Sequence, residues 1–404
     1  MADGLEQALQ TQEQAPEPVG REGQAKPKSR RDHRVDALRG IALTMMFVDH
    51  MPQNLLNRFT LRNVGFADAA EIFVLLAGFA SMLAYGGAIR REGLWIGFER
   101  IVRRCIKLYL FQCGLLVAMV FLIRSWNRHV SPAPVDYLEP ELVHGPSNLW
   151  RVLTLDALPA SLNILPLYIV LLLCFPLIFK LVDFNRFLAL GVSAALWGMV
   201  NLDPQINLPN WLDPDGWFFD PFAWQFLFTL GIVAAAETRR YGGHFPRRWW
   251  LIAPCYAYLG FSALQSFPWA QWGLPDLAPL ALRSPDKTLL SPLRLLDVLA
   301  IFYLVECSAT AAWLSETRVG QVLAVYGRHS LEVFSLGTFF DLLGKLAFTR
   351  FGNGWAMQIV VNVVGLGALY GLAVWLDNRK QVQKRAGGGI TVITSRAAPD
   401  GASP

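Results

Sequence analysis

The sequence predicts an all-α, polytopic membrane protein with about ten transmembrane helices, and two observations lead to this fold class. Of the 404 residues, 53% are hydrophobic and 17% are charged, whereas a soluble domain carries about 25% charged residues. The charges cluster between apolar runs, several of which reach about 20 residues, the length that crosses a bilayer as a helix. The net charge of +5 is small and comes from residues at the ends of these runs, so no nucleic-acid partner is expected.

The individual helices follow from the apolar runs in order along the chain. The first run is interrupted by polar residues and the fifth is short. The ten predicted helices are 37–55, 69–87, 103–123, 163–182, 187–202, 221–237, 249–267, 292–313, 329–347 and 355–376. They form one transmembrane domain over 34–380. The flanking segments 1–33 and 381–404 are rich in small and polar residues and in Pro, a composition typical of disordered tails.

Lys and Arg are distributed unequally between the alternating connecting segments. The segments on one side, which include 21–39 and 377–385, carry 25 of the 36 Lys and Arg residues, whereas those on the other side carry 10. Because cytoplasmic loops carry the excess of positive charge, both termini are expected in the cytoplasm. The prediction is a multi-pass membrane protein, surrounded by membrane lipids.

Three ionisable residues share one face of the first predicted helix. Arg39 and His50 are eleven residues apart, which places them within about 20° of each other around a helix and about 16 Å apart along it. Asp36 lies one turn before Arg39. Such a stripe should face the bundle interior or a water-filled cavity. The stripe is either a functional site or a structural hydrogen-bond cluster, and the alignment of three ionisable residues favours function.

The second predicted helix adds two carboxylates near the level of His50. Asp68 and Glu71 lie one turn apart at its start, and a short loop joins it to the first helix. A carboxylate beside an imidazole fixes its tautomer, as a general base requires. We therefore predict His50 as the base and Glu71, or Asp68, as the group that orients it. The alternative is that Glu71 is an interfacial charge that marks the start of the helix.

Several motifs of the sequence resemble a known family. An Asp-x-x-Arg-Gly motif, a His eleven residues after the Arg, an outer loop and the run FVLLAGF are similar to the membrane-bound acyltransferase-3 superfamily. The resemblance is closer to its OpgC branch, whose members O-succinylate osmoregulated periplasmic glucans, and it covers about residues 30–380. The segments that carry it are DALRGIALTMMFVDHMP, EIFVLLAGF, LNILPLYIVLL, PFAWQFLFTLG and YGRHSLEVF. Ala77 stands where many relatives have Ser.

The resemblance implies a catalytic His50, an essential Arg39, an acyl-CoA donor from the cytoplasm and an acceptor hydroxyl on a periplasmic glucan. Succinyl-CoA is then a co-substrate, and no permanently bound cofactor is expected. The His residues show no metal-ligand spacing. In addition to Arg39, the candidate donor-binding residues are Arg104, Arg328 and His329. The alternative explanation for these cations is the positive-inside rule alone. Acceptor-binding candidates, which also fit helix packing, are Asn163 and Tyr168. Three outer cations could each pair with a succinyl carboxylate: Arg58, Arg62 and Arg151.

Two features of the reaction stay open at this point. Direct transfer is favoured over an acyl-His50 intermediate, because the sequence contains no G-x-S-x-G elbow. The acyl group could also be acetyl or another group, and the acceptor another envelope polysaccharide or a lipid. A transporter or flippase without acyl-transfer chemistry is a further alternative. It would spread ionisable residues over many helices, whereas here they gather in the first two.

Overall fold

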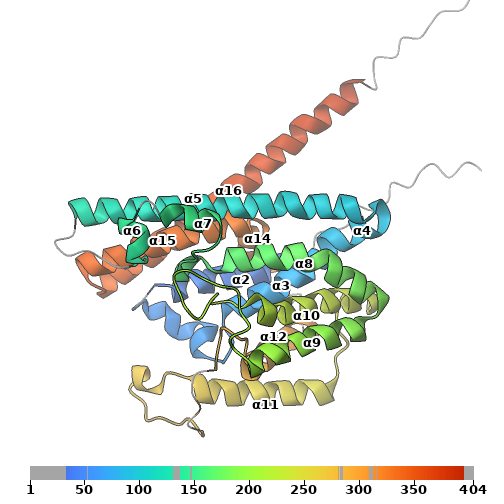
Figure 1. The fold of residues 1–404 in the computed structure, drawn as a ribbon, viewed down its shortest axis with the longest axis horizontal. Coiled ribbons are helices and arrows are strands. Elements are labelled where there is room, and N and C mark those ends of the chain that lie inside the picture. The colour runs from blue at the N-terminus through green and yellow to red at the C-terminus, as the bar shows by residue number, and fades with distance from the viewer. Residues whose placement is uncertain are drawn as a thin grey trace, which may run out of the picture. The chain divides into compact units, whose positions relative to one another are not determined.

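The computed structural model describes residues 33–51, 53–130, 137–145, 148–280, 282, 285–308, 313–314 and 316–394. Every regular element in these ranges is a helix (Figure 1), so the all-α prediction is confirmed for the described residues. The predicted N-terminal tail lies outside them apart from His33. The predicted C-terminal tail, 381–404, overlaps the last helix, which runs to Thr394.

A helix lies over each of the ten predicted ranges. In chain order these are α2 (His33–Asp49), α3 (Ala69–Ser81), α5 (Leu94–His129), α8 (Ile164–Phe184), α9 (Arg186–Leu202), α10 (Pro221–Arg240), α11 (Trp249–Ser266), α12 (Pro292–Cys307), α15 (Ser330–Phe351) and α16 (Trp355–Thr394). After α3 the helix continues through η3 (Met82–Gly86) and α4 (Gly87–Glu92).

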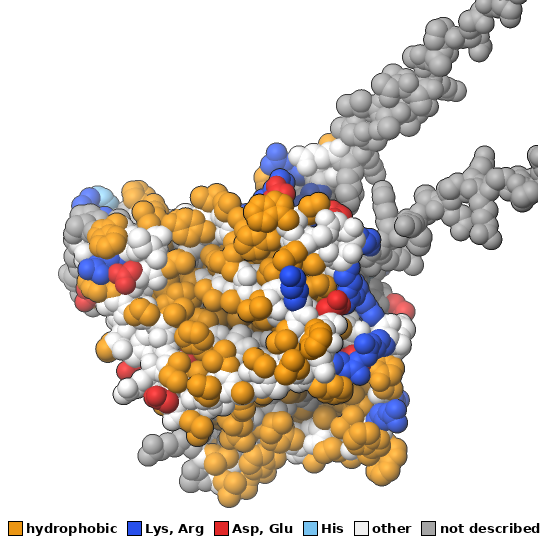
Figure 2. Space-filling view, turned by 45° about the vertical axis from the view of Figure 1, so that its right-hand side comes forward, with side chains coloured by type: hydrophobic (Ala, Val, Ile, Leu, Met, Phe, Trp, Pro, Cys, Tyr) orange, Lys and Arg blue, Asp and Glu red, His pale blue; other side chains and the backbone are white. Residues whose placement is uncertain are grey.

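Four of the described helical segments are long and apolar enough to cross a membrane. They are Ala69–Glu92, Leu94–His129, Ile164–Phe184 and Trp355–Gln383, and Arg186–Leu202 is a shorter apolar helix. The number of ten spans and the cytoplasmic termini therefore stay predictions. The surface agrees with a membrane environment. Figure 2 shows hydrophobic side chains spread across the middle of one face and Lys and Arg side chains gathered mainly toward its right-hand side.

The first predicted helix differs from the observed one at both ends. It was predicted over 37–55, but α2 starts at His33 and ends at Asp49. The sequence has a proline at position 52, and a residue before proline disfavours helical backbone, which explains the early end. Two short helices then follow, η1 (Leu55–Phe59) and η2 (Leu61–Asn63).

Several short helices were not predicted, among them α14 (Arg318–Arg328), which packs against α2. The two backbones approach so closely that glycine is required on both sides. A Cβ at Gly40 would lie 2.0 Å from the Leu323 carbonyl oxygen, and one at Gly327 would lie 1.8 Å from the Asp36 carbonyl oxygen. Small residues allow this kind of close helix pairing in membranes. The helix has only 11 residues, and Arg318, Gln321 and Arg328 interrupt or flank its apolar residues, so hydrophobic run length did not reveal it.

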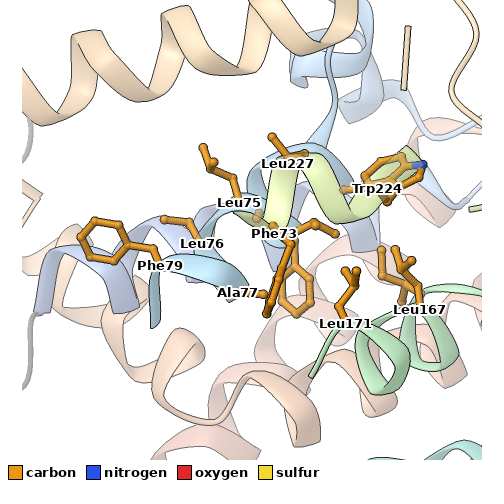
Figure 3. Packing of buried hydrophobic residues seen from close by; sticks show 14 of the residues in the cluster. Phe73, Leu75, Leu76, Ala77, Phe79, Leu167, Leu171, Trp224 and Leu227 are labelled. Atoms are coloured by element: carbon orange, nitrogen blue, oxygen red, sulfur yellow. The ribbon is translucent and has the colours of Figure 1, made fainter. Parts of the chain in front are cut away.

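A core of buried aromatic and aliphatic side chains joins α3 to α8 and α10 (Figure 3). Phe73, Leu76 and Phe79 of α3 are buried, as are Leu167 of α8 and Trp224 of α10. This packing fixes the start of α3, where the predicted carboxylates lie. The remaining described short helices are α6 (Pro140–His144), α7 (Leu149–Leu153), η5 (Ala160–Leu162) and η6 (Trp269–Trp272).

Candidate active site

A cavity of about 770 Å³ lies where α2 ends and α3 begins. A small-molecule site typically occupies a concave space of this size. Its charged and titratable lining residues are Asp49, His50, Arg62, Asp68, Lys287 and Arg294. Neutral polar side chains of Asn63, Ser161, Asn163 and Gln265 and the rings of Phe218 and Phe219 also line it. Segments far apart in the sequence therefore build one mixed polar and aromatic cavity.

Two carboxylates, Asp68 and Glu71, form the start of α3, and Asp68 also lines this cavity. The Asp68 carboxylate accepts a hydrogen bond from the Ala70 backbone N–H at 2.8 Å, and the Glu71 carboxylate accepts one from the Asp68 N–H at 2.9 Å. This reciprocal arrangement is a capping box, which satisfies backbone donors that the first helical turn would otherwise leave unpaired. The sequence pattern Asp-x-x-Glu therefore has a local structural role.

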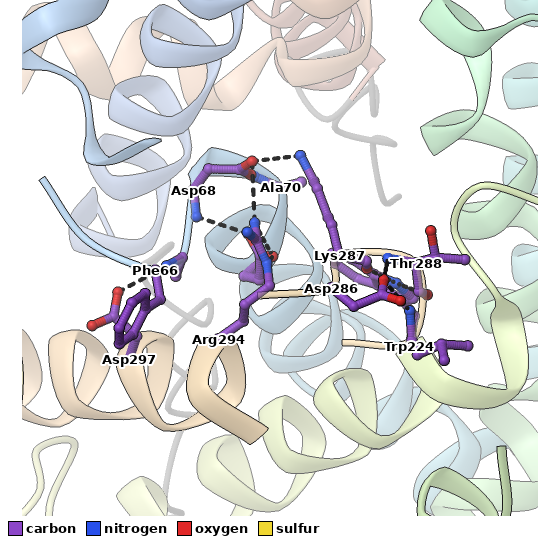
Figure 4. A network of polar contacts seen from close by, with 12 residues as sticks. Phe66, Asp68, Ala70, Trp224, Asp286, Lys287, Thr288, Arg294 and Asp297 are labelled. Atoms are coloured by element: carbon purple, nitrogen blue, oxygen red, sulfur yellow. Dashed lines mark hydrogen bonds and ion pairs between the residues drawn. The ribbon is translucent and has the colours of Figure 1, made fainter. Parts of the chain in front are cut away.

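The same carboxylates bind two cations from a distant part of the chain (Figure 4). Arg294 Nη2 lies 2.6 Å from Glu71 Oε1 and 3.3 Å from Asp68 Oδ2, and Lys287 Nζ lies 2.5 Å from Asp68 Oδ2. Glu71 is fully buried, with 0% of its surface exposed. A buried carboxylate needs such a partner, because an uncompensated charge away from water is costly. The network is a neutral set of two carboxylates and two cations.

The two cations determine the protonation of Asp68. Burial disfavours the ionised carboxylate, but the adjacent Lys287 ammonium and Arg294 guanidinium outweigh burial and hold the pKa of Asp68 well below its usual range. Asp68 is thus a carboxylate at neutral pH and does not act as a proton donor.

Backbone contacts hold Lys287 and the turn before α3 in place. The indole N–H of the buried Trp224 donates to the carbonyls of Lys287 and Thr288 at 3.2 and 3.0 Å. Asp297 Oδ2 accepts from the Ala67 N–H at 2.9 Å (Figure 4), and the Phe66 N–H donates to Ser262 at 2.8 Å. Helices α10, α11 and α12 therefore fix the cavity wall from outside.

His50 directly follows α2 and is exposed in the cavity. Its backbone N–H donates to the Met46 carbonyl at 3.1 Å, so it continues the last turn of the helix. Its ring Nδ1 lies 2.6 Å from the same carbonyl oxygen. A carbonyl oxygen only accepts hydrogen bonds, so Nδ1 carries the proton. In the neutral ring Nε2 is then the unprotonated nitrogen.

The group that orients His50 differs from the prediction. Glu71, or Asp68, was expected beside the imidazole. The Glu71 carboxylate instead binds Arg294 and the start of α3, and the Asp68 carboxylate binds Lys287 and the Ala70 N–H. The Met46 carbonyl holds the ring instead. A residue four positions earlier on the same helix can reach the ring without any neighbouring helix. Every residue has a backbone carbonyl, so no pattern of residue types in the sequence could have predicted this contact.

Asp49 and Arg62 lie next to His50 in the cavity wall. The Asp49 carboxylate accepts a hydrogen bond from the Thr60 hydroxyl at 2.5 Å. Arg62 Nη1 donates to the Asp49 backbone carbonyl at 3.3 Å. The short helices after α2 thus fold back and bring one cation close to the histidine.

A family model described as OpgC protein matches residues 31–381 of the chain. The chain belongs to the OpgC protein family. Membership indicates involvement in the modification of osmoregulated periplasmic glucans, and the family name suggests an acyltransferase. The comparison with curated proteins gave no match.

In this OpgC protein one of the two predicted acceptor-binding residues lines the cavity. Asn163 lies at the start of α8, is buried and lines the cavity, and its Oδ1 has no hydrogen-bond partner among the described residues. Tyr168 lies one turn further along α8 and packs edge-on against Phe73 at 6.4 Å. It therefore belongs to the packed core rather than to the cavity lining.

The remaining predicted residues of the OpgC protein lie away from the cavity lining. Asp36 and Arg39 are on the first half of α2, and the Arg39 Nε atom is buried without a hydrogen-bond partner in the described part of the chain. Arg104 lies on α5.

A second group forms where α14 meets α15. Arg328 Nη2 lies 3.3 Å from one oxygen of Asp377, and His329 Nε2 lies 3.4 Å from the other. Lys380 Nζ lies 3.4 Å from His329 Nδ1. Because an ammonium can only donate, His329 Nδ1 accepts and Nε2 carries the proton toward Asp377. This pairing ties the α14–α15 junction to α16.

Two charged residues that line the cavity, Lys287 and Arg294, were not predicted as site residues. Both fell into a predicted outer segment, where a cation is unremarkable. Arg294 also opens a predicted helix in the run SPLRLLDVLA. A sequence pattern could have identified this wall of the cavity. Arg294 and Asp297 are a cation and an acid that lie one turn apart in an apolar helix.

Proposed function

We propose that the chain transfers an acyl group, succinyl from succinyl-CoA, to a hydroxyl of a periplasmic glucan, with His50 as the general base. The observation that carries this proposal is the fixed tautomer of His50. Its Nδ1 proton is held by the Met46 carbonyl, which leaves the Nε2 lone pair as the basic site of a ring that is exposed in a 770 Å³ cavity. A base must present such a lone pair to the proton that it removes.

The reaction is a direct transfer in a ternary complex. Nε2 of His50 takes the proton of the acceptor hydroxyl while the hydroxyl oxygen attacks the thioester carbon. The C–S bond then breaks, the acyl–oxygen bond remains, and the proton passes from Nε2 to the leaving sulfur. Negative charge develops on the thioester oxygen during attack, and cations of the cavity wall are the groups that would steady it. Lys287 is the candidate, since a quarter of its side chain is exposed.

The proposed arrangement in the membrane follows from the Lys and Arg distribution. Ten helices cross the inner membrane with both termini in the cytoplasm, as in the acyltransferase-3 superfamily that the sequence resembles. The cavity residues Arg62, Ser161, Phe219 and Lys287 come from four connecting segments that carry few cations. This distribution supports a cavity that faces the periplasm.

The donor would reach the cavity from the opposite end of α2. Arg39, Arg104, Arg328 and His329 are the proposed contacts to the CoA phosphates, and cations bind phosphate well. Arg39 precedes His50 by eleven residues, about 16 Å along a helix. The extended pantetheine arm would span this distance, with no permanently bound cofactor required.

The acceptor would occupy the open part of the cavity. The rings of Phe218 and Phe219 and the amides of Asn163 and Gln265 line it. Sugar rings pack their apolar faces on aromatic side chains, and amides both donate to and accept from sugar hydroxyls. This mixture supports a carbohydrate acceptor.

Of the three outer cations considered for the succinyl carboxylate, one lines the cavity. Arg62 lines it and donates to the Asp49 carbonyl, next to His50. Arg58 lies over the Trp272 ring at 5.9 Å, and Arg151 is paired with Asp156 at 2.7 Å. We therefore assign the succinyl carboxylate to Arg62.

Mass spectrometry of periplasmic glucans tests this function. A strain that lacks the protein is complemented with the natural chain, with His50→Gln and with His129→Gln. His129→Gln is the matched control, because His129 is the last residue of α5 and does not line the cavity. The natural chain and His129→Gln should restore a succinyl mass on the glucan, whereas His50→Gln should lower it at least 100-fold. Unchanged glucan mass in the deletion strain would reject the proposal.

A further inference from the structure

Two neutral side chains of the cavity differ from the rest of its lining. Ser161 Oγ and Asn163 Oδ1 are both buried, and neither has a hydrogen-bond partner among the described residues. Asn163 as a whole is only 3% exposed. Buried polar atoms are almost always hydrogen-bonded, so these two oxygens lack the partners that a protein ordinarily supplies. Because both residues line the cavity, a partner can reach them from inside it.

The position of Asn163 in the chain makes its free amide unexpected. Asn163 is the N-cap residue of α8, yet its side chain makes no capping hydrogen bond. An N-cap Asn ordinarily accepts from a backbone N–H of the first helical turn. Asn185, the N-cap of α9, does so, because its Oδ1 accepts from the N–H groups of Phe187 and Leu188 at 2.9 and 3.2 Å. The Asn163 amide is therefore not used for capping and is available to the cavity.

The other two amide side chains of the cavity lining are already engaged. Gln265 bonds both backbone groups of Leu280: its Nε2 donates to the Leu280 carbonyl, and its Oε1 accepts from the Leu280 N–H at 3.2 Å. Asn63 Nδ2 donates to the Asn57 carbonyl at 2.7 Å. These contacts hold loops of the cavity wall in place. The start of α8, in contrast, keeps its capacity to bond a molecule in the cavity.

Contacts from two other parts of the chain hold the backbone that carries these two oxygens. Leu162, the residue between them, is completely buried, and its carbonyl accepts from Gln112 Nε2 of α5 at 3.1 Å. Asn210 bonds both backbone groups of Leu158, with its Oδ1 accepting at 3.0 Å and its Nδ2 donating at 3.2 Å. Groups that are fixed before a ligand arrives bind it with a smaller loss of conformational entropy.

The chemistry of the cavity indicates what kind of group these oxygens bind. An amide oxygen only accepts hydrogen bonds, so the ligand of Asn163 Oδ1 must donate one. Lys287 and Arg294 line the same cavity and disfavour a cationic donor such as an amine. A neutral hydroxyl fits both conditions. Phe218, which is 39% exposed and also lines the cavity, offers a ring to the apolar face of a sugar.

We propose that Ser161 and Asn163 form a subsite that binds non-reacting hydroxyls of the acceptor sugar while His50 acts on another hydroxyl. The inference rests on the proposed function in taking a sugar as the acceptor. Asn163 Oδ1 accepts a hydrogen bond from one hydroxyl, and Ser161 Oγ donates to or accepts from another. No covalent step takes place in this subsite. It gives selectivity, because an alcohol with a single hydroxyl leaves both oxygens without a partner.

The test measures glucan binding by the full chain in detergent, without acyl-CoA. Isothermal titration calorimetry with unsubstituted glucan from the deletion strain gives the Kd. Asn163→Ala and Ser161→Ala should each raise this Kd about two- to tenfold, the effect of one lost hydrogen bond. Asn185→Ala is the matched control: it should lower the midpoint of thermal unfolding, since a helix cap is lost, and leave the Kd unchanged. An unchanged Kd in both Asn163→Ala and Ser161→Ala would overturn the proposal.

Two further measurements separate the possible failures. If Asn163→Ala does not fold, Ser161→Ala decides, because it removes a single atom. Where transfer is measured, both variants should raise the KM for glucan and change kcat little, since hydroxyls that do not react are bound equally before and during the reaction. A natural chain that binds glucan through these residues but transfers no acyl group would reject the proposed function and support the subsite. A natural chain that does not bind glucan would reject both.

Discussion

Arg294 of α12 binds Glu71 of α3 through two nitrogens, with Nε and Nη2 each 2.6 Å from Oε1. The carboxylate is fully buried and the guanidinium side chain is 9% exposed. A contact of this kind joins two helices that are more than 200 residues apart in the chain. It also determines where the cavity wall stands relative to His50.

Breaking this pair should be strongly destabilising. Arg294→Met would leave Glu71 buried without its cation, at a cost of about 3–5 kcal/mol, and should lower the midpoint of thermal unfolding in detergent. Arg100→Met is the matched control, because Arg100 pairs with Glu92 at the surface, where such pairs contribute about 0–1 kcal/mol. Equal effects of the two substitutions would contradict a structural role for the buried pair.

Stability should depend on pH through Asp68. The pKa of Asp68 is lowered in the folded state, against burial, by Lys287 and Arg294. A lowered folded-state pKa adds stability above the unfolded value of about 3.9, and this stability is lost as the pH falls toward the folded-state pKa. The natural chain should therefore lose thermal stability below about pH 4. Asp68→Asn should be less stable at pH 7 and show a flatter pH dependence; equal slopes would contradict the assignment.

Arg62 should determine the preference for the acyl group. Arg62→Gln removes the proposed partner of the succinyl carboxylate and should lower succinyl transfer at least about tenfold, since a charge-assisted hydrogen bond is lost. Transfer from acetyl-CoA, which has no such carboxylate, should change much less. Rates with both donors are compared in membrane vesicles, with Arg58→Gln as the control because Arg58 packs on Trp272. A parallel loss with both donors would exclude a role in specificity.

The contact between α2 and α14 should tolerate no side chain at Gly40. Gly40→Ala would place a Cβ 2.0 Å from the Leu323 carbonyl oxygen, and relieving such overlap should cost about 1–3 kcal/mol. Gly114→Ala is the control, since a Cβ there meets nothing within 4 Å and alanine favours helix by about 1 kcal/mol. Thermal unfolding should separate the two, and equal stability would show that α14 can shift away.

More of the fold than of the site could be predicted from the sequence. The apolar runs are long, and each of the ten gave a helix, because run length and period reflect the solvent around the chain. The motifs also indicated the OpgC family, which the comparison confirms over 31–381. The short helix α14 was not predicted, because its packing depends on Gly40 and Gly327 rather than on an apolar run.

Several residues of the site were predicted, but their partners from distant parts of the sequence were not. His50, Asp68 and Asn163 line one cavity, and helical spacing suggested the first two. The partners of Glu71 and Asp68 come from α12 and the loop before it, and no local pattern relates positions so far apart.

The pairing of Glu71 with Arg294 also has a consequence for biogenesis. The two residues are separated by 223 positions, and a ribosome that adds about 5–20 residues per second needs roughly ten seconds or more to make the second after the first. During that interval α3 exists with a carboxylate whose cation has not been synthesised. We expect α3 to stay loosely packed in the bilayer, or bound to an insertase, until α12 has been synthesised. The later helices then complete the cavity, so we expect a prematurely terminated chain to lack an assembled cavity.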